Sequence, residues 1–474
     1  MGIVGFVIGV VCGCSTTAVV AQNSVTVDYS SVVNSAASPY LFGGSNEPNP
    51  SDQATVYPML KSVGVKFQRG DIHLDQVLPT GITVAEYQAN TNGVANPANW
   101  NWGPLSWVSE AKAQGFTTMA NILYAPTWLT YSGTIQGVPS NWSVWQDIVT
   151  KIVEHEGSSL NYLEILNEPT CGFVATSGSS YGSAGAAADD MYYYAAVAAR
   201  AGSSSLIIGG DGDCENSGSF GALSKIIPDS RLTSNLLQFV SYHIYSPTAA
   251  ASDNIGTLEA LLANNGRSGL PIFITEWNYN YTANTTDPHI VGGETITYAV
   301  MQFMLWSTQS QLAGVDIYSF IPSNEVLSAY EDCSGCDNIA QGFYRVNSGT
   351  TTLATQSRAY QLMSVALGLG LGNFKVYSTA TLGLTGAQGF INAKKNVAAI
   401  MTNDSSSAET ATVTLKNVDA SGCNFTVYIY TADTGSNTAI NPTSTLTNQC
   451  ITNGTVTLSN IALPSYSAVG VIIN

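Results

Sequence analysis

The stretch Tyr162-Leu-Glu-Ile-Leu-Asn-Glu-Pro169 decides the fold of this chain. It is typical of a short buried strand that stops at Asn167-Glu168-Pro169, so polar side chains stand where the strand leaves its sheet. A second apolar run, Leu270-Pro-Ile-Phe-Ile-Thr-Glu276-Trp277, also ends on a glutamate. In a barrel of parallel strands, the carboxyl ends of all strands meet at one face. We therefore expect both glutamates to face a single cleft.

Outward from these two strands, short apolar runs alternate with longer segments of helical spacing. This alternation is typical of repeated βα units. Eight strand ends are predicted, at residues 41–44, 65–69, 118–123, 163–166, 206–209, 239–243, 272–275 and 315–319. Helices between them are predicted at residues such as 142–156, 186–201 and 295–311. The pattern predicts an α/β fold, a (β/α)8 TIM barrel over residues 40–372, with the two glutamates at its fourth and seventh strands.

The chain changes character after residue 372. Short segments of alternating apolar and polar residues, separated by turn residues, predict a β-sandwich over residues 373–474. Near the other end, Val25-Thr-Val-Asp-Tyr29 predicts a strand within residues 22–39. We expect this N-terminal strand to pair with the sandwich.

The composition favours a globular protein with an uncharged partner. Hydrophobic residues make up 45% of the 474 residues and charged residues only 10%. The 15 Lys and Arg against 32 Asp and Glu leave a net charge of −17. Such a charge repels nucleic acid, anionic membranes and polyanionic substrates. Beyond the first residues, no apolar run is long enough to span a membrane.

The N-terminal segment has features of a secretory signal peptide. The apolar run from Ile3 to Val11 is followed by small residues, which predicts a signal over residues 1–21; a lipid-modified Cys14 is the alternative. Six cysteines remain, and an even number in a secreted chain favours disulfides. Sequence proximity favours the pairs Cys171 with Cys214, Cys333 with Cys336, and Cys423 with Cys450, although a zinc site at the middle pair stays open. Sequons predict N-glycosylation at Asn141, Asn280, Asn284, Asn403, Asn424 and Asn453.

Two carboxyl groups across one cleft are the groups that hydrolysis of a glycosidic bond requires. One must protonate the leaving oxygen, and the other must face the oxocarbenium-like transition state. We predict Glu168 as the general acid/base and Glu276 as the nucleophile. A separation of about 5–5.5 Å would indicate retention through a covalent intermediate.

These motifs resemble those of a clan of retaining glycoside hydrolases that carry the two glutamates on the fourth and seventh barrel strands. Asn167-Glu168-Pro169 matches the Asn-Glu-Pro motif of the clan, and Thr275-Glu276-Trp277-Asn278 is most similar to glycoside hydrolase family 39. Families 79 and 30 share the architecture. The resemblance covers residues 23–474, barrel and sandwich together.

The resemblance implies roles for four further residues. Asn167 would hydrogen-bond the 2-hydroxyl of the sugar, an interaction that strengthens in the transition state. Arg69 would keep the nucleophile ionised by charge pairing. His243 and Tyr245, after the sixth strand, would position the nucleophile.

Other side chains are weaker candidates for contacts with a sugar. Asp71 and His73 follow Arg69 closely and are expected to bind hydroxyls, and Asn46-Glu47-Pro48 is expected to form a subsite or a turn. Aromatic rings match the apolar face of a pyranose. The aromatic candidates are Trp128, Trp277, Tyr279 and Tyr318.

Together these features predict a secreted retaining glycosidase of a neutral plant or microbial oligosaccharide or polysaccharide. A β-glucuronidase-type exo-glycosidase of family 79 kind and an inactive carbohydrate-binding barrel remain alternatives. The four histidines form no paired metal motif, and Gly209-Gly210-Asp-Gly212 lacks the lysine of a phosphate loop. We therefore expect neither metal nor cofactor.

Overall fold

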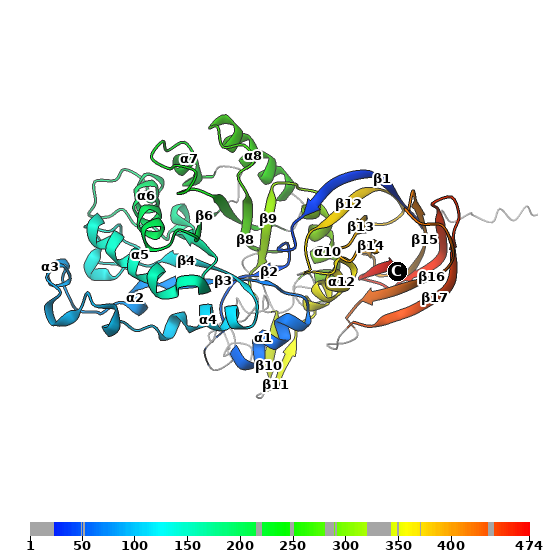
Figure 1. The fold of residues 1–474 in the computed structure, drawn as a ribbon, viewed down its shortest axis with the longest axis horizontal. Coiled ribbons are helices and arrows are strands. Elements are labelled where there is room, and N and C mark those ends of the chain that lie inside the picture. The colour runs from blue at the N-terminus through cyan, green and yellow to red at the C-terminus, as the bar shows by residue number, and fades with distance from the viewer. Residues whose placement is uncertain are drawn as a thin grey trace, which may run out of the picture.

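The computed structural model describes residues 23–48, 50, 53–214, 220–246, 251–279, 289, 292–319, 343–347, 350–369, 371–434 and 440–474. The predicted signal peptide, Cys333, Cys336, and the sequons at Asn280 and Asn284 lie outside these residues. A barrel and a β domain lie side by side, and the strand β1 reaches from one across the other (Figure 1).

Eight parallel strands form a closed barrel, which confirms the predicted architecture. They are β2 (Gly43–Gly44), β3 (Phe67–His73), β4 (Thr117–Leu123), β5 (Tyr162–Ile165), β6 (Ile207–Cys214), β7 (Phe239–Tyr245), β8 (Ile272–Asn278) and β9 (Leu312–Ile317). Each strand pairs with the next in sequence, and β2 closes the ring by pairing with β9. Glu168 follows the fourth barrel strand and Glu276 lies on the seventh.

Four strands run further than the sequence predicts. β3 continues past Arg69 to His73 and β8 past Thr275 to Asn278, and β6 and β7 extend to Cys214 and Tyr245. The predicted ends lie close to the first polar residues of each run. At the carboxyl end of a barrel, however, inward positions of a strand line a cleft and are polar.

Helices surround the barrel. The α-helices are α1 (Gln53–Ser62), α2 (Leu74–Val77), α3 (Val84–Gln88), α4 (Ser106–Ala113), α5 (Trp142–Glu156), α6 (Ala184–Gly202), α7 (Leu223–Ile226), α8 (Ala251–Asn264), α10 (Glu294–Ser307) and α12 (Ser357–Leu367). Short 3-10 turns are η1 (Thr91–Gly93), η2 (Pro97–Asn99), η3 (Gly103–Leu105), η4 (Thr127–Leu129), η5 (Gly157–Ser159) and η6 (Pro169–Cys171). A hairpin of β10 (Tyr344–Asn347) and β11 (Thr350–Leu353) precedes α12.

The helix α5 shows how the sequence sets these elements. The side chain of Asn141 caps its first turn by accepting a hydrogen bond from the Val144 amide. Apolar residues recur at helical spacing, and those from Val144 to Val153 are buried against the barrel. The helix ends at Gly157, whose φ of 52° favours a residue without a side chain.

The β domain is one mixed, nine-stranded sheet that curls around a core of its own. Its remaining strands are β12 (Phe374–Leu382), β13 (Gly386–Ile391), β14 (Val397–Asn403), β15 (Glu409–Lys416), β16 (Gly422–Ala432), β17 (Pro442–Ile451), β18 (Val456–Leu463) and β19 (Ser467–Ile473). The N-terminal strand β1 (Asn23–Ala37) lies between β12 and β15, as predicted. Val25 and Val27 of β1 are fully buried in this core, so the N-terminal segment is part of the domain.

Two of the predicted disulfides are formed. Cys171 is bonded to Cys214, and Cys423 to Cys450, which ties β16 to β17. One sequon prediction is wrong: the Asn403 amide is 2% exposed and donates to the carbonyls of Ser407, Leu463 and Pro464. A glycan on that nitrogen would break all three hydrogen bonds. Three other sequons lie on the described surface, at Asn141, Asn424 and Asn453.

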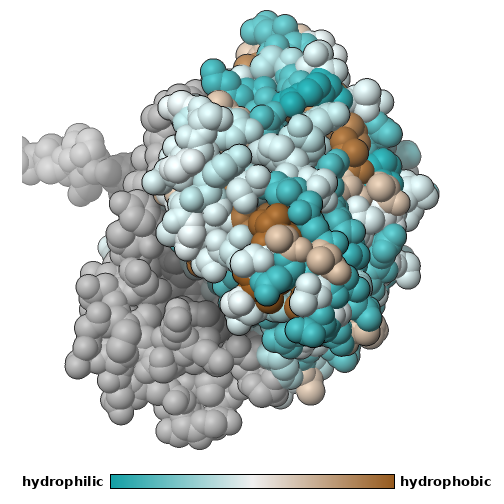
Figure 2. Space-filling view, turned by 90° about the vertical axis from the view of Figure 1, so that its left-hand side faces the viewer, coloured by the Kyte–Doolittle hydropathy of each residue, from teal (hydrophilic) through white to brown (hydrophobic). Residues whose placement is uncertain are grey.

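The outer surface fits a polar protein with few charges. The face of the barrel turned away from the β domain is largely hydrophilic, with apolar residues in small groups (Figure 2). Among the described residues, no helix combines the length with the apolar character that a membrane span requires.

Candidate active site

The interior of the barrel is built in layers that change from apolar to charged. Phe67, Met119, Phe239 and Phe273 form an apolar cluster at the amino-terminal end. On β3, Arg69 follows Phe67 by two positions, so it points to the same inner side one layer higher. The aromatic layer therefore supports a charged layer at the carboxyl end.

Arg69 is the centre of the charged layer. Its guanidinium donates from Nε to Glu164 Oε2 (2.7 Å) and from Nη1 to Glu276 Oε1 (2.9 Å). Nη1 also donates to Ser45 Oγ, and Nη2 to Asn167 Oδ1, both at 2.8 Å. Burial lowers the pKa of Arg69, but the charges of Glu164 and Glu276 raise it above its usual value. The side chain is a permanent cation with 1% exposure.

Glu276 is held on both of its oxygens. Besides the contact of Oε1 with Arg69, Oε2 accepts a 2.7 Å hydrogen bond from the Tyr245 hydroxyl. The side chain is 12% exposed, so part of it remains open to solvent. Burial raises the pKa of Glu276, and the positive charges of His243 and Arg69 oppose that rise.

Glu168 stands on an unusual backbone. Its φ is 42° and that of Leu166 is 76°, both in the left-handed region that residues with side chains rarely adopt. The Glu168 amide donates to the Gly212 carbonyl (3.0 Å), and η6 follows at once. The disulfide between Cys171 and Cys214 ties η6 to the end of β6. These contacts hold the strained turn that presents the carboxyl group.

His243 links the two glutamates. Its Nδ1 lies 2.7 Å from Glu168 Oε1 and 3.5 Å from Glu276 Oε2. Burial lowers the pKa of His243, but the Glu276 charge and the Glu168 hydrogen bond raise it above its usual value. Burial raises the pKa of Glu168, yet the hydrogen bond and charge of His243 bring it below the usual value. The imidazole and the Glu168 carboxyl thus form one unit that holds a proton.

The two carboxyl groups lie close together. One oxygen of Glu168, one of Glu276 and one ring nitrogen of His243 all lie within 4.8 Å of one another. Retaining glycosidases separate their carboxyls by about 5–5.5 Å and inverting ones by about 6.5–9.5 Å. The spacing could also accommodate a cation, but Arg69 already balances Glu276, and His243 balances Glu168. The arrangement therefore fits paired acid and nucleophile chemistry without an ion.

Glu47 and Asp71 form a second acidic group close to Arg69. The Asp71 amide donates to Glu47 Oε2 (3.0 Å), and Asp71 Oδ2 lies 3.3 Å from His73 Nε2. Burial, together with the charge of Asp71, raises the pKa of Glu47 to about 7. Burial raises the pKa of Asp71, but His73 and Arg69 bring it below its usual value. The structure thus brings Asp71 and His73 together, and adds Glu47 to them.

The predicted aromatic residues have different surroundings. Tyr318 is half-buried, 6.1 Å from the Tyr245 ring, and burial together with the Glu276 charge raises its pKa to about 12. Trp128 is half-buried too: one face stacks on Tyr87, and its Nε1 donates to a backbone carbonyl. Tyr279 is stacked on His289 at 4.1 Å.

The prediction that Trp277 contacts a sugar is wrong. Its side chain is 1% exposed and packs against Trp306 and Phe303 of α10, with ring centroids 4.9 and 5.5 Å away. Successive residues of a strand point to opposite faces, so Glu276 points into the barrel and Trp277 points out to the helices. The ring is a core residue with no face available to a sugar.

Two residues around Arg69 were missed from the sequence. Glu164 is fully buried, and Ser45 lies at the end of the first barrel strand. A charged residue inside the otherwise apolar run Leu163-Glu164-Ile165 was a usable signal, because a buried carboxylate needs a partner. Ser45 carries no comparable signal.

The chain was compared with known proteins. No protein-family model matches it, and no curated protein matches it in sequence. Solved structures do match over nearly the whole chain. These structures, to which the fold is similar, are glycoside hydrolases. A glucosidase from Croceicoccus marinus superposes with a TM-score of 0.66 at 15% identity, covering 96% of this chain and 99% of its own.

Two further structures broaden the comparison. A family 39 β-xylosidase from Caulobacter crescentus has a TM-score of 0.63 at 13% identity, covering 95% of this chain and 99% of its own. A family 30 subfamily 8 xylanase from Clostridium acetobutylicum has a TM-score of 0.61 at 13% identity, with the same coverage. At these identities the likeness shows a shared fold, which is the fold that the sequence predicted.

Proposed function

We propose that the protein is a secreted retaining glycosidase that cleaves O-glycosidic bonds of a neutral saccharide. The observation that carries the proposal is the pair of carboxylate oxygens, from Glu168 and Glu276, within 4.8 Å of each other at the carboxyl end of the barrel. Disulfides are typical of proteins outside the cytosol, and they support secretion.

The partners of each glutamate support the division of roles. Glu276 is bound to Arg69, which never loses its charge, and to the Tyr245 hydroxyl. A carboxylate held in this way can attack the anomeric carbon and form the glycosyl-enzyme bond. Glu168 has a titratable partner, His243, so it can give a proton to the leaving oxygen and later take one from water.

The directions of the pKa shifts constrain how this pair works in the free enzyme. The pKa of Glu276 is raised and that of Glu168 is lowered, which by itself favours a proton on the nucleophile. Because interacting carboxyls titrate as a pair, the singly protonated enzyme is a mixture of two forms. The form with the proton on Glu168 and the charge on Glu276 is the active one. His243 Nδ1, 2.7 Å from Glu168 Oε1, shares its proton with that carboxyl, and its positive charge lowers the pKa of both glutamates.

The cleft supports a neutral substrate. Asp71 and Glu47 lie beside Arg69, whose guanidinium is already bonded to Glu164 and Glu276. A uronic acid would bring its carboxylate close to Asp71, whose pKa lies below the usual value, and the two negative charges would repel each other. The structural neighbours are described as a glucosidase, a xylosidase and a xylanase, so glucosides and xylosides are the first substrates to test.

Hydrolysis of aryl glycosides tests the proposal. Wild type, Glu276→Gln, Glu168→Gln and the exposed control Glu110→Gln are compared on nitrophenyl xylosides, glucosides and arabinofuranosides. We expect loss of at least about 10⁴-fold in kcat for Glu276→Gln. Glu168→Gln should lose about 10²–10⁴-fold on an oligosaccharide but less on nitrophenyl glycosides, whose leaving group needs no proton.

The stereochemistry of the product is the second readout. Proton NMR of the first sugar released should show the anomer of the substrate, because two displacements restore the configuration. Release of the opposite anomer, or full activity in Glu276→Gln, would contradict the proposed mechanism.

A further inference from the structure

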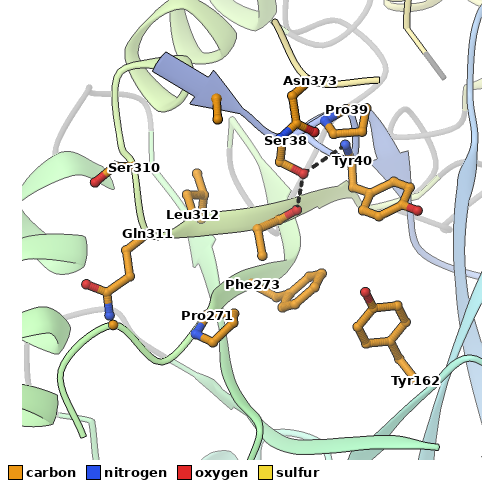
Figure 3. A pocket seen from close by; sticks show the side chains of 13 residues that line it. Ser38, Pro39, Tyr40, Tyr162, Pro271, Phe273, Ser310, Gln311, Leu312 and Asn373 are labelled. Carbon is orange, nitrogen blue, oxygen red and sulfur yellow. Dashed lines mark hydrogen bonds between the residues drawn. The ribbon is translucent and has the colours of Figure 1, made fainter. Parts of the chain in front are cut away.

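A cavity of about 530 Å³ opens at the amino-terminal end of the barrel, opposite the glutamates. It is lined by the starts of three barrel strands, through Tyr162 of β5, Phe273 of β8 and Leu312 of β9. Tyr40, just before β2, and Asn373, just before β12, complete it (Figure 3). Its volume falls in the range of roughly 300–1,000 Å³ that small-molecule sites occupy.

The cavity is separate from the cleft. The rings of Phe67 and Phe273 are stacked 5.7 Å apart inside the barrel, and Phe239 packs edge-on against Phe273 at 5.1 Å. This aromatic layer lies between the cavity and the layer of Arg69. A molecule in the cavity therefore cannot touch the catalytic carboxyls.

Tyrosine rings form one wall of the cavity. Tyr40 and Tyr162 are both half-buried and lie next to each other (Figure 3). Tyr162 is braced from behind by Phe67 and Phe273, at 5.7 and 5.5 Å. The Tyr162 hydroxyl makes no hydrogen bond to any residue that the structure describes. Each ring thus offers an apolar surface and a polar hydroxyl to the same space.

The opposite side of the cavity is polar but uncharged. The Gln311 amide is oriented by a 2.8 Å hydrogen bond from Nε2 to the Leu270 carbonyl. Ser310 is exposed on this side of the mouth, and Asn373 is exposed on the other side, near Pro39 and Tyr40 (Figure 3). Every lining residue is neutral, although the chain carries 32 Asp and Glu and a net charge of −17. The lining excludes ions as preferred ligands and leaves a neutral molecule with both apolar and hydroxylated surfaces.

We propose that this cavity is a second saccharide-binding site, which holds sugar units of a neutral polymer while the cleft at the other end of the barrel cleaves it. A pyranose presents one apolar face to an aromatic ring and hydroxyls along its edge to amides and hydroxyl groups. The second site raises the local concentration of polymer at the enzyme. This role rests on the proposed glycosidase function, whereas sugar binding in the cavity does not.

Filling the cavity tests the proposal. Ser310→Trp and, from the other side of the mouth, Asn373→Trp place an indole in the space, and neither side chain hydrogen-bonds any residue that the structure describes. Ser406→Trp, at an exposed serine between β14 and β15, is the matched control. Each change is combined with Glu276→Gln, so that the probe is not hydrolysed, and calorimetry measures binding of xylohexaose and cellohexaose.

We expect two binding sites for at least one probe in Glu276→Gln and in the control, and one site in both cavity-filled variants. With Glu276 intact, the cavity-filled variants should show a roughly tenfold higher KM on the soluble polymer and unchanged kcat/KM on aryl glycosides. Equal stoichiometry in all variants, or no binding of either probe, overturns the proposal.

Failure of this site and failure of the proposed function give different results. If wild type hydrolyses aryl glycosides while all variants bind one oligosaccharide, the second site is wrong and the glycosidase stands. If no glycoside is hydrolysed but a binding site disappears in Ser310→Trp and Asn373→Trp, the glycosidase is wrong and the saccharide site stands.

Discussion

The two ends of the barrel use the same eight strands for opposite purposes. At the amino-terminal end, the inward side chains are Phe67, Phe239 and Phe273, which pack ring against ring. At the carboxyl end, the same strands β3 and β8 carry Arg69 and Glu276. One end stabilises the barrel by burying apolar surface, and the other gives up that stabilisation to hold charges.

The charged layer, unlike the apolar layer, depends on a single residue, Arg69. Glu164 is completely buried, and Arg69 is its ion-pair partner. A buried carboxylate left without its partner costs several kcal/mol of stability, about as much as the cavity left by a removed aromatic ring. Removing an aromatic ring from the amino-terminal layer should lower stability but not catalytic activity. Removing Arg69 from the carboxyl layer should lower both.

Replacing Arg69 should have the largest combined effect on stability and activity. Arg69→Met should lower the free energy of unfolding by about 3–5 kcal/mol, because Glu164 stays buried without a cation. It should also lower kcat/KM on aryl glycosides by at least about 10²-fold, because Glu276 loses a charged hydrogen bond. Phe273→Ala should cost a similar 3–5 kcal/mol through the cavity it leaves.

Urea unfolding and aryl glycoside hydrolysis of the two variants separate the roles. In Phe273→Ala, kcat/KM of the folded enzyme should be unchanged. Equal losses of activity in both variants would mean that the layers are not separate.

A smaller effect is expected at His243, whose charge acts on both glutamates. His243→Asn keeps a polar side chain but removes the positive charge that lowers the pKa of Glu168 and of Glu276. Both pKa values should rise, so both limbs of the profile of kcat/KM against pH should move to higher pH. The control is His155→Asn, on α5. An unmoved profile would mean that His243 is neutral in the free enzyme.

The smallest effect concerns a buried acid of the barrel that the chemistry does not use. Asp316 on β9 is fully buried, and burial raises its pKa well above the usual value. The folded protein therefore keeps the proton that the unfolded chain releases above about pH 4. As a result, the free energy of unfolding falls as the pH rises above about 4. Asp316→Asn removes this loss.

Thermal unfolding at several pH values measures the effect at Asp316. The variant should be more stable than wild type at pH 7, with the difference shrinking to nothing below about pH 4. Asp419→Asn, at an exposed position, is the control. A variant that is less stable than wild type at neutral pH would show that Asp316 is ionised and paired.

Much of the architecture was readable in the sequence. The alternation of apolar runs with helical segments predicted the barrel, and polar residues at the ends of two apolar runs predicted that Glu168 and Glu276 face one cleft. Their oxygens do lie within 4.8 Å. These features are local: a strand is recognised from its own residues, and closing a parallel barrel brings all carboxyl ends to one face.

The remaining features needed the tertiary structure. Trp277 and Glu276 are neighbours, and only the register of β8 in the closed barrel decides which of them points inward. The burial of Asn403, the ion pair of Arg69 with Glu164, and the amino-terminal cavity each join segments far apart in the chain. Short-range periodicity in the amino-acid sequence was enough to predict which elements form and at which end of the barrel polar groups gather. Which side chains meet was decided by packing between distant segments, which no local pattern encodes.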